Sequence, residues 1–159
     1  MWGRIKEVIK ENQPISYTGI PRHIALWMTS GFGDIVYENP NFNGNDANRI
    51  DIYCVHGTAD RSASFSLVAR RLIREVPDNV ASIRLVSFEG RAQGNGIHYF
   101  ASQLVAKIQA NQHSNVMLMG HSRGGVVVAL ADILATEKGI KVHAVFPISA
   151  PFEDRKSVV

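Results

Sequence analysis

The stretch from Gly120 to Gly124 reads GHSRG and places Ser122 between two glycines. Apolar runs precede it and follow it. The pattern G-x-S-x-G suits a strand-to-helix turn so tight that only small residues fit two positions before and two positions after the serine. Such a turn exposes the hydroxyl at the carboxyl edge of a sheet, beside helix N–H groups that favour developing negative charge. The chemistry predicted for Ser122 is therefore that of a nucleophile.

The elements expected to position Ser122 form a regular series from Arg49 onward, in which short β-branched runs alternate with helical stretches. This alternation is typical of parallel βαβ units and predicts an α/β fold with a mainly parallel sheet. Pro77 is expected to end the first helix and Gly139 to cap the last one. Strands are expected at 49–55, 82–88, 115–119 and 141–149, the last kinked or ended near Pro147, and helices at 64–76, 98–112 and 124–138.

The first 48 residues form a separate region in this interpretation, ahead of a core at 49–159. An N-terminal amphipathic helix is expected first, and a turn-rich Asn/Gly connector at 39–48 is expected last. Between them, HIALWM (23–28) and DIVYE (34–38) favour an antiparallel hairpin around TSGFG. A helix that begins at Pro21 and is followed by a strand is the alternative.

A second loop, VHGTAD at 55–60, follows the strand expected at 49–55. With MGHSRGG at 119–125, it resembles the α/β-hydrolase fold family of lipases and esterases, over about 100 residues from Asp51 to Pro151. The resemblance covers only the N-terminal portion of that fold. It implies helices on both faces of the sheet, a strand order of 82–88, 49–55, 115–119 and 141–149, and a binding site where the two loops meet.

The resemblance also implies roles for individual residues. Ser122 would be the nucleophile, and the backbone N–H of Arg123 would be one donor to the oxyanion. The second donor would be the N–H of Thr58, in a loop that Gly57 allows to turn close to the substrate carbonyl. The alternative is a tight structural turn in a Rossmann-like protein, without chemistry.

A serine nucleophile needs a base within hydrogen-bond reach. His98 follows the loop after the strand at 82–88, so it emerges at the edge where Ser122 is expected and is the one candidate for an unusual base. A surface histidine at a helix N-terminus is the competing interpretation. His143 is rejected because it lies at the start of a strand, opposite Ser122. His56 and His121 are expected to be packed, hydrogen-bonded residues, and nothing favours a role for His23 or His113.

The acid of the family would correspond to Glu153 or Asp154, which follow the last expected strand; solvated tail carboxylates are the competing interpretation. No histidine follows them in the sequence. The core therefore lacks the C-terminal strands and the base of the family pattern. We expect a fragment of a serine hydrolase for an ester, thioester or lipid acyl group, with little activity alone, completed by a missing C-terminal segment or a second chain. A non-catalytic binding or scaffold protein is the alternative.

Composition excludes several other classes. A net charge of +3, with no basic run interleaved with aromatics, argues against nucleic-acid binding. Cys54 is the one cysteine, so an intrachain disulfide is impossible, and its apolar surroundings predict a buried thiol. The sequence contains neither a signal-peptide pattern nor an apolar run long enough to cross a membrane, which favours the cytoplasm. No cofactor and no metal are expected.

Overall fold

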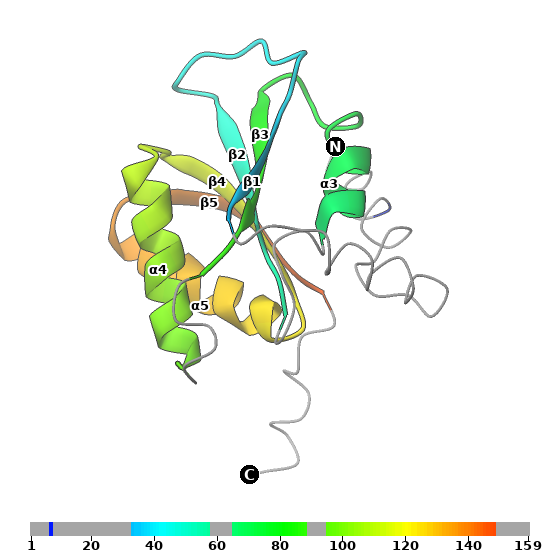
Figure 1. Ribbon diagram of the computed structural model, residues 1–159. Helices are drawn as coiled ribbons and strands as arrows, with labels where there is room; N and C mark the ends of the chain where they lie inside the picture. The colour runs from blue at the N-terminus through cyan, green and yellow to red at the C-terminus, as the bar shows by residue number, and fades with distance from the viewer. Residues whose placement is uncertain (1–6, 8–32, 58–64, 89–94, 149–159) are drawn as a thin grey trace.

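The computed structural model describes residues 7, 33–57, 65–88 and 95–148. Its centre is a five-stranded sheet of order β1-β3-β2-β4-β5 (Figure 1). The strands β2 to β5 run parallel, and β1 pairs antiparallel with β3. The order of the four parallel strands confirms the predicted order. The strands are β1 (Ile35–Glu38), β2 (Ile50–Val55), β3 (Val80–Val86), β4 (Asn115–His121) and β5 (Lys141–Ile148).

Helices cover both faces of this sheet, as expected. The helix α3 (Ser66–Leu72) lies on one face, and α4 (Ile97–Ala110) and α5 (Arg123–Glu137) lie on the other (Figure 1). Every residue of β2 is buried because this strand lies in the middle of the sheet, between β3 and β4. A strand covered on both faces by helices is apolar at nearly every position rather than at alternate ones, and Asp51 is the exception in β2.

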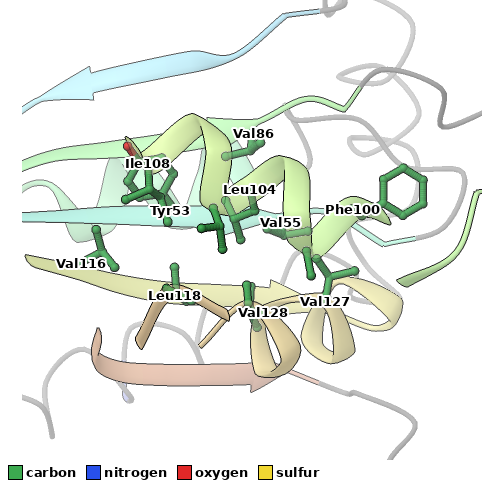
Figure 2. Packing of buried hydrophobic residues seen from close by; sticks show 14 of the residues in the cluster. Tyr53, Val55, Val86, Phe100, Leu104, Ile108, Val116, Leu118, Val127 and Val128 are labelled. Atoms are coloured by element: carbon green, nitrogen blue, oxygen red, sulfur yellow. The ribbon is translucent and has the colours of Figure 1, made fainter. Parts of the chain in front are cut away.

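The two apolar clusters of the core follow from the alternation of side chains along each strand. Ile52 and Cys54 of β2 pack with α3, whereas Tyr53 and Val55 pack with α4 and α5. Figure 2 shows the second cluster, in which Leu104 belongs to α4. Full burial of a side chain of this size contributes roughly 1.5–3 kcal/mol. Cys54 is buried as predicted, and burial raises the pKa of its thiol.

The ends of the elements differ slightly from the sequence prediction. The helix α3 ends at Leu72, and the chain continues in turns toward Pro77. Gly139 follows α5 with φ +76°, as a glycine cap requires. The prediction that the last strand is kinked or ended near Pro147 agrees with β5, which runs through Pro147 and ends at Ile148. Proline is tolerated there because β5 borders the described sheet, so one of its sides needs no N–H donor.

The expected strand at 34–38 is present as β1, paired with β3. Its expected hairpin partner, 23–28, lies outside the described residues, so the hairpin stays a prediction. The connector after β1 is solvated and rich in turns, as expected. Within the described ranges, every helix falls short of the length and apolarity needed to cross a membrane.

Candidate active site

Ser122 lies between the last residue of β4 and the first residue of α5. Its backbone has φ +54° and ψ −123°, a conformation that costs a non-glycine residue on the order of 1–3 kcal/mol. A tight turn between strand and helix is thus present where the glycine spacing predicted it. Two backbone hydrogen bonds hold it: the Ser122 N–H donates to the Ile148 carbonyl at 2.8 Å, and the Gly125 N–H donates to the Ser122 carbonyl at 2.9 Å. The residue is partly exposed, and its hydroxyl caps no N–H group of α5.

The glycines two positions before and after Ser122 are required by close backbone contacts. A Cβ atom at Gly120 would lie 2.7 Å from the Gly125 nitrogen, and one at Gly124 would lie 2.6 Å from the His56 carbonyl oxygen. Both neighbours are backbone atoms, which cannot move aside as a flexible side chain could. The packing of α5 against the ends of β2 and β4 therefore demands the glycine spacing that the sequence shows.

The loop after β2 leaves the sheet at the same edge as Ser122. The register pairs Val55 of β2 with Gly120 of β4, and the two strands run parallel. His56 and Gly57 follow directly, and the carbonyl of His56 occupies the space that a Cβ atom at Gly124 would need. This places Gly57 beside the Ser122 turn, as expected. Thr58, the expected second donor, lies outside the described residues.

His56 is a packed residue, as expected. Its side chain is buried, and Nδ1 lies 2.9 Å from the Gly57 carbonyl oxygen. Its ring centroid lies 6.1 Å from that of Phe88, the second residue after β3. His56 therefore links the loop after β2 to the chain after β3. His121, inside the turn sequence, is also buried.

The side chain of Arg123 has contacts that sequence reasoning missed. Its Nη2 donates a hydrogen bond to the carbonyl of Asn95 at 2.9 Å, and the guanidinium lies 5.6 Å from the centroid of the Phe100 ring. Both partners belong to the start of α4. The sequence held one signal for these contacts: a long cationic side chain next to Ser122, together with an aromatic residue in the first turn of the neighbouring helix.

His98 lies in the first turn of α4, and the Arg123 contacts bring this end of the helix to the Ser122 turn. The imidazole is exposed, and its Nδ1 lies 3.5 Å from the Ser102 hydroxyl of the same helix. Among the described residues, no histidine is hydrogen-bonded to the Ser122 hydroxyl. A role for His98 as a base stays a prediction. Glu153 and Asp154 lie outside the described residues.

His143 lies at the opposite edge of the sheet, as expected. Its Nε2 is 3.2 Å from the Asn115 side-chain oxygen at the start of β4. Burial, and to a smaller degree the neighbouring charge of Lys141, lowers its pKa. The structure keeps His143 away from Ser122 because parallel strands all start at the edge that the turn does not reach.

Nothing in the sequence recommended His113 as the base, and the structure places it away from Ser122, beside Asp51 and Tyr53. It takes part in a buried polar network at the same edge as His143, centred on the fully buried Asp51. Asp51 accepts hydrogen bonds from Nε and Nη2 of Arg49, at 2.9 and 3.1 Å, and one from the Ser82 hydroxyl. The His113 Nε2 lies 3.4 Å from the Asp51 carboxylate, and its Nδ1 lies 2.8 Å from the Tyr53 hydroxyl.

Electrostatics at this edge reflect burial and pairing. Burial lowers the pKa of His113 although Asp51 opposes the change, and the hydrogen bond to Asp51 raises the pKa of Arg49. Burial raises the pKa of Tyr53 to about 12, against a hydrogen bond from Asn111. The sequence signal for this network was an aspartate inside an apolar strand, since a buried charge needs partners.

A polar hollow of about 290 Å³ adjoins the network. It is lined by Asp46, Arg49, Asp51, Asn111, Gln112, His113 and Ser114.

The described residues contain no group of three or more His, Cys, Asp or Glu side chains arranged to hold a metal ion. At the Ser122 edge, the structure shows a hydroxyl on a strained turn at the N-terminus of α5.

No family model and no curated protein matches the sequence. Among solved structures, the chain is similar to the type II thioesterase BorB from the borrelidin biosynthetic cluster, with a TM-score of 0.50 and 16% sequence identity. It is also similar to YbtT, a type II thioesterase from the yersiniabactin NRPS/PKS biosynthetic pathway, with a TM-score of 0.46 and 19% identity. The match to BorB covers 71% of this chain and 47% of that chain, and the match to YbtT covers 69% and 43%. The chain thus spans less than half the length of these structures, and its fold is the α/β-hydrolase fold of BorB.

Proposed function

We propose that this chain is the nucleophile-bearing part of a serine acyl hydrolase that acts on an ester, thioester or lipid acyl group. The observation that carries the proposal is the backbone conformation of Ser122. This residue lies at the junction of β4 and α5 and has a φ of +54°. Strained conformations of this kind persist where the surrounding structure maintains them, and they cluster at active sites. The glycines required at positions 120 and 124 support the same conclusion, because they bring α5 close to the loop after β2.

In the proposed reaction, the Ser122 oxygen attacks the acyl carbon while its proton passes to a base. The oxyanion of the tetrahedral intermediate accepts hydrogen bonds from the backbone N–H groups of Arg123 and Thr58, assisted by the N-terminus of α5. Collapse of the intermediate breaks the bond to the alcohol or thiol, which takes up a proton and leaves an acyl-serine ester. Water then attacks that ester, and Ser122 regains its proton as the acid product departs.

The base and acid are the part of the proposal that lies beyond the described residues. We assign the acid to Glu153 or Asp154, and the base to a histidine from a further C-terminal segment or a second chain. The partial coverage supports the assignment of the base to a further segment, because the match covers only 47% of BorB. In the same proposal, residues 49–159 are a hydrolase core without its C-terminal strands, preceded by a region at 1–48 whose strand β1 joins the core sheet.

A thioester is the first substrate to test because BorB is a type II thioesterase. The second candidate function is a binding or scaffold protein that keeps the fold without the chemistry. The two functions differ in whether Ser122 is a nucleophile.

Covalent labelling with a fluorophosphonate separates these functions. The experiment compares the intact mass and labelled site of the wild type, Ser122→Ala and Ser114→Ala; Ser114 is an exposed serine just before β4, at the other end of the sheet. We expect one adduct, on Ser122, in the wild type and in Ser114→Ala, and none in Ser122→Ala. An unlabelled wild type, or a label that persists in Ser122→Ala, would support the scaffold instead.

Turnover of a p-nitrophenyl ester and of an N-acetylcysteamine thioester tests the missing base. Triad-deleted enzymes keep rates roughly 10³- to 10⁴-fold above water from oxyanion stabilisation and binding, so we expect feeble hydrolysis, of which Ser122→Ala removes only the part that proceeds through an acyl-serine. His98→Ala is expected to leave this rate unchanged. Robust turnover that is lost in both variants would show instead that His98 is the base and that the 159 residues suffice.

A further inference from the structure

We propose that the Arg123 side chain is a positioning residue, which anchors the start of α4 against the Ser122 turn and so holds one wall of the acyl site in place. The inference rests on the proposed function and deepens it. It is distinct from the role proposed for the Arg123 backbone N–H, because it concerns the guanidinium, which points away from the peptide bond toward another element.

The first support is the pair of contacts that the guanidinium makes. Its Nη2 hydrogen-bonds to the carbonyl of Asn95, and its plane lies near the Phe100 ring. Asn95 lies just before α4, and Phe100 is in the first turn of that helix. One side chain therefore contacts the start of α4 at two points, across 28 residues of sequence in the case of Asn95.

The second support is that the start of α4 lacks a side-chain cap among the described residues. The N-cap residue is Gly96, which makes no side-chain capping bond, and the first turn contains no acidic residue. The backbone bond from the Phe100 N–H to the Gly96 carbonyl is long, at 3.3 Å. Because helix starts leave N–H groups without intrahelical partners, an uncapped start tends to fray. Arg123 acts here as an anchor supplied by another element.

The third support is a row of rings that extends from Phe100 to the other side of the site. The centroid of Phe100 lies 5.4 Å from that of Phe88, which in turn lies 6.1 Å from that of His56. His56 adjoins the proposed oxyanion loop through its contact with the Gly57 carbonyl. The start of α4 is thus packed between the loop after β2 and the side chain that follows Ser122, and a displacement of it would alter both sides of the site.

The chemistry of arginine suits this position better than that of lysine. A planar guanidinium can lie against an aromatic ring while an N–H at its rim donates to a carbonyl. An ammonium group keeps the charge but does not reproduce both contacts. The conservative variant Arg123→Lys should therefore restore only part of the function lost in Arg123→Met.

Hydrogen exchange of the full 159-residue chain tests the anchoring without any need for activity. In Arg123→Met, the amides of residues 97–101 should exchange at least about fivefold faster, since their opening no longer breaks the Arg123 contacts. In Arg123→Lys the increase should be smaller. The control is Arg71→Met, which removes an exposed arginine of α3 paired with Glu75, and it should leave 97–101 unchanged. Unchanged exchange in Arg123→Met would overturn the inference.

Labelling kinetics test the link to the acyl site. The concentration dependence of inactivation by a short-chain and a long-chain fluorophosphonate separates probe binding from the maximal rate. In Arg123→Met, binding of the long-chain probe should weaken about tenfold, because a misplaced wall loses its contacts with the chain, whereas binding of the short-chain probe should weaken much less. A merely structural role of Arg123 would slow labelling by both probes equally, and that result would refute the positioning role.

A wild type that is not labelled at all would refute the proposed function. Hydrogen exchange would still report on whether Arg123 anchors the start of α4. Arg123→Lys replaces Arg123→Met in both assays if the latter does not fold.

Discussion

At the carboxyl edge of the sheet, Ser122 occupies a strained turn with a partly exposed side chain, whereas at the amino edge Asp51 is buried and surrounded by donors. Both edges are built from the same strands, β2 and β4. At the first, backbone atoms approach so closely that glycine is required. At the second, side chains fill the space and hydrogen-bond to one another.

The polar groups of the amino edge form one consistent chain of donors and acceptors. The Asn111 amide donates to the Tyr53 hydroxyl at 3.0 Å. If the Tyr53 O–H then donates to Nδ1 of His113, the His113 Nε2–H is directed at Asp51, and the remaining lone pairs of Asp51 accept from Arg49 and Ser82. A buried network satisfied in this way makes the structure rigid. The difference between the edges is that side-chain hydrogen bonds stabilise one end of the sheet, whereas the strained turn with the proposed nucleophile lies at the other.

Asp51→Ala should produce the largest effect on stability. It leaves Arg49, Ser82 and His113 without their common acceptor, and the loss of one partner from a buried ion pair costs about 3–5 kcal/mol. Urea denaturation measures this change. The control Glu137→Ala, which removes an exposed carboxylate near the end of α5, should change the free energy of unfolding by less than about 0.5 kcal/mol. A small loss in Asp51→Ala would show that the network contributes little.

Gly124→Ala should destabilise the fold by about 1–3 kcal/mol, since the added methyl group must displace the backbone at His56. The proposed oxyanion loop moves with that backbone, so labelling of Ser122 should slow as well. The matched control is Gly33→Ala, where a Cβ meets no atom within 4 Å. Thermal unfolding and labelling kinetics of the two variants provide the comparison. Equal unfolding temperatures and labelling rates in the two variants would mean that close packing is not the reason for glycine at position 124.

Ser122→Gly should stabilise the protein by about 1 kcal/mol while it abolishes labelling, because glycine adopts the positive φ without strain but its greater freedom in the unfolded chain offsets part of the gain. Ser122→Ala also removes the hydroxyl yet keeps the strain, so it should give no such gain. A higher denaturation midpoint for the glycine variant than for the alanine variant would support strain at the carboxyl edge, and equal midpoints would contradict it.

The pH dependence of stability should be a smaller effect, and it should come from the amino edge. Burial lowers the pKa of His113 in the folded state below its ordinary value of 6.5. The unfolded chain therefore binds protons first as the pH falls, so this contribution is complete above about pH 6.5 and is lost as the pH falls toward the folded pKa. His143, also with a lowered pKa, acts in the same direction.

Urea midpoints at pH 7.5 and 5.5 measure this loss, and His113→Gln and His143→Gln assign it to each residue. We expect His113→Gln to reduce the difference between the two pH values. If the difference were unchanged in His113→Gln, the network would not be the source of the pH dependence.

The sequence by itself determined those features that depend on local chemistry. The period of apolar residues predicted the four parallel strands and three helices, since burial on one or two faces imposes that period. The glycine spacing around Ser122 predicted the strained turn, because the steric demand acts between residues only a few positions apart. Gly139 predicted the end of α5 for the same reason.

Only the tertiary structure decided the contacts between residues far apart in sequence. The pairing of β1 with β3, the anchoring of Asn95 by Arg123, and the meeting of Asp51 with His113 all depend on strand order and register. His113 is 62 positions from Asp51, yet the parallel pairing of β2 with β4 brings the chain just before β4 to the start of β2. An arginine or histidine has the same local pattern whether it faces solvent or a buried carboxylate. Its partner is chosen by the packing of the sheet, and no spacing along the chain encodes that choice.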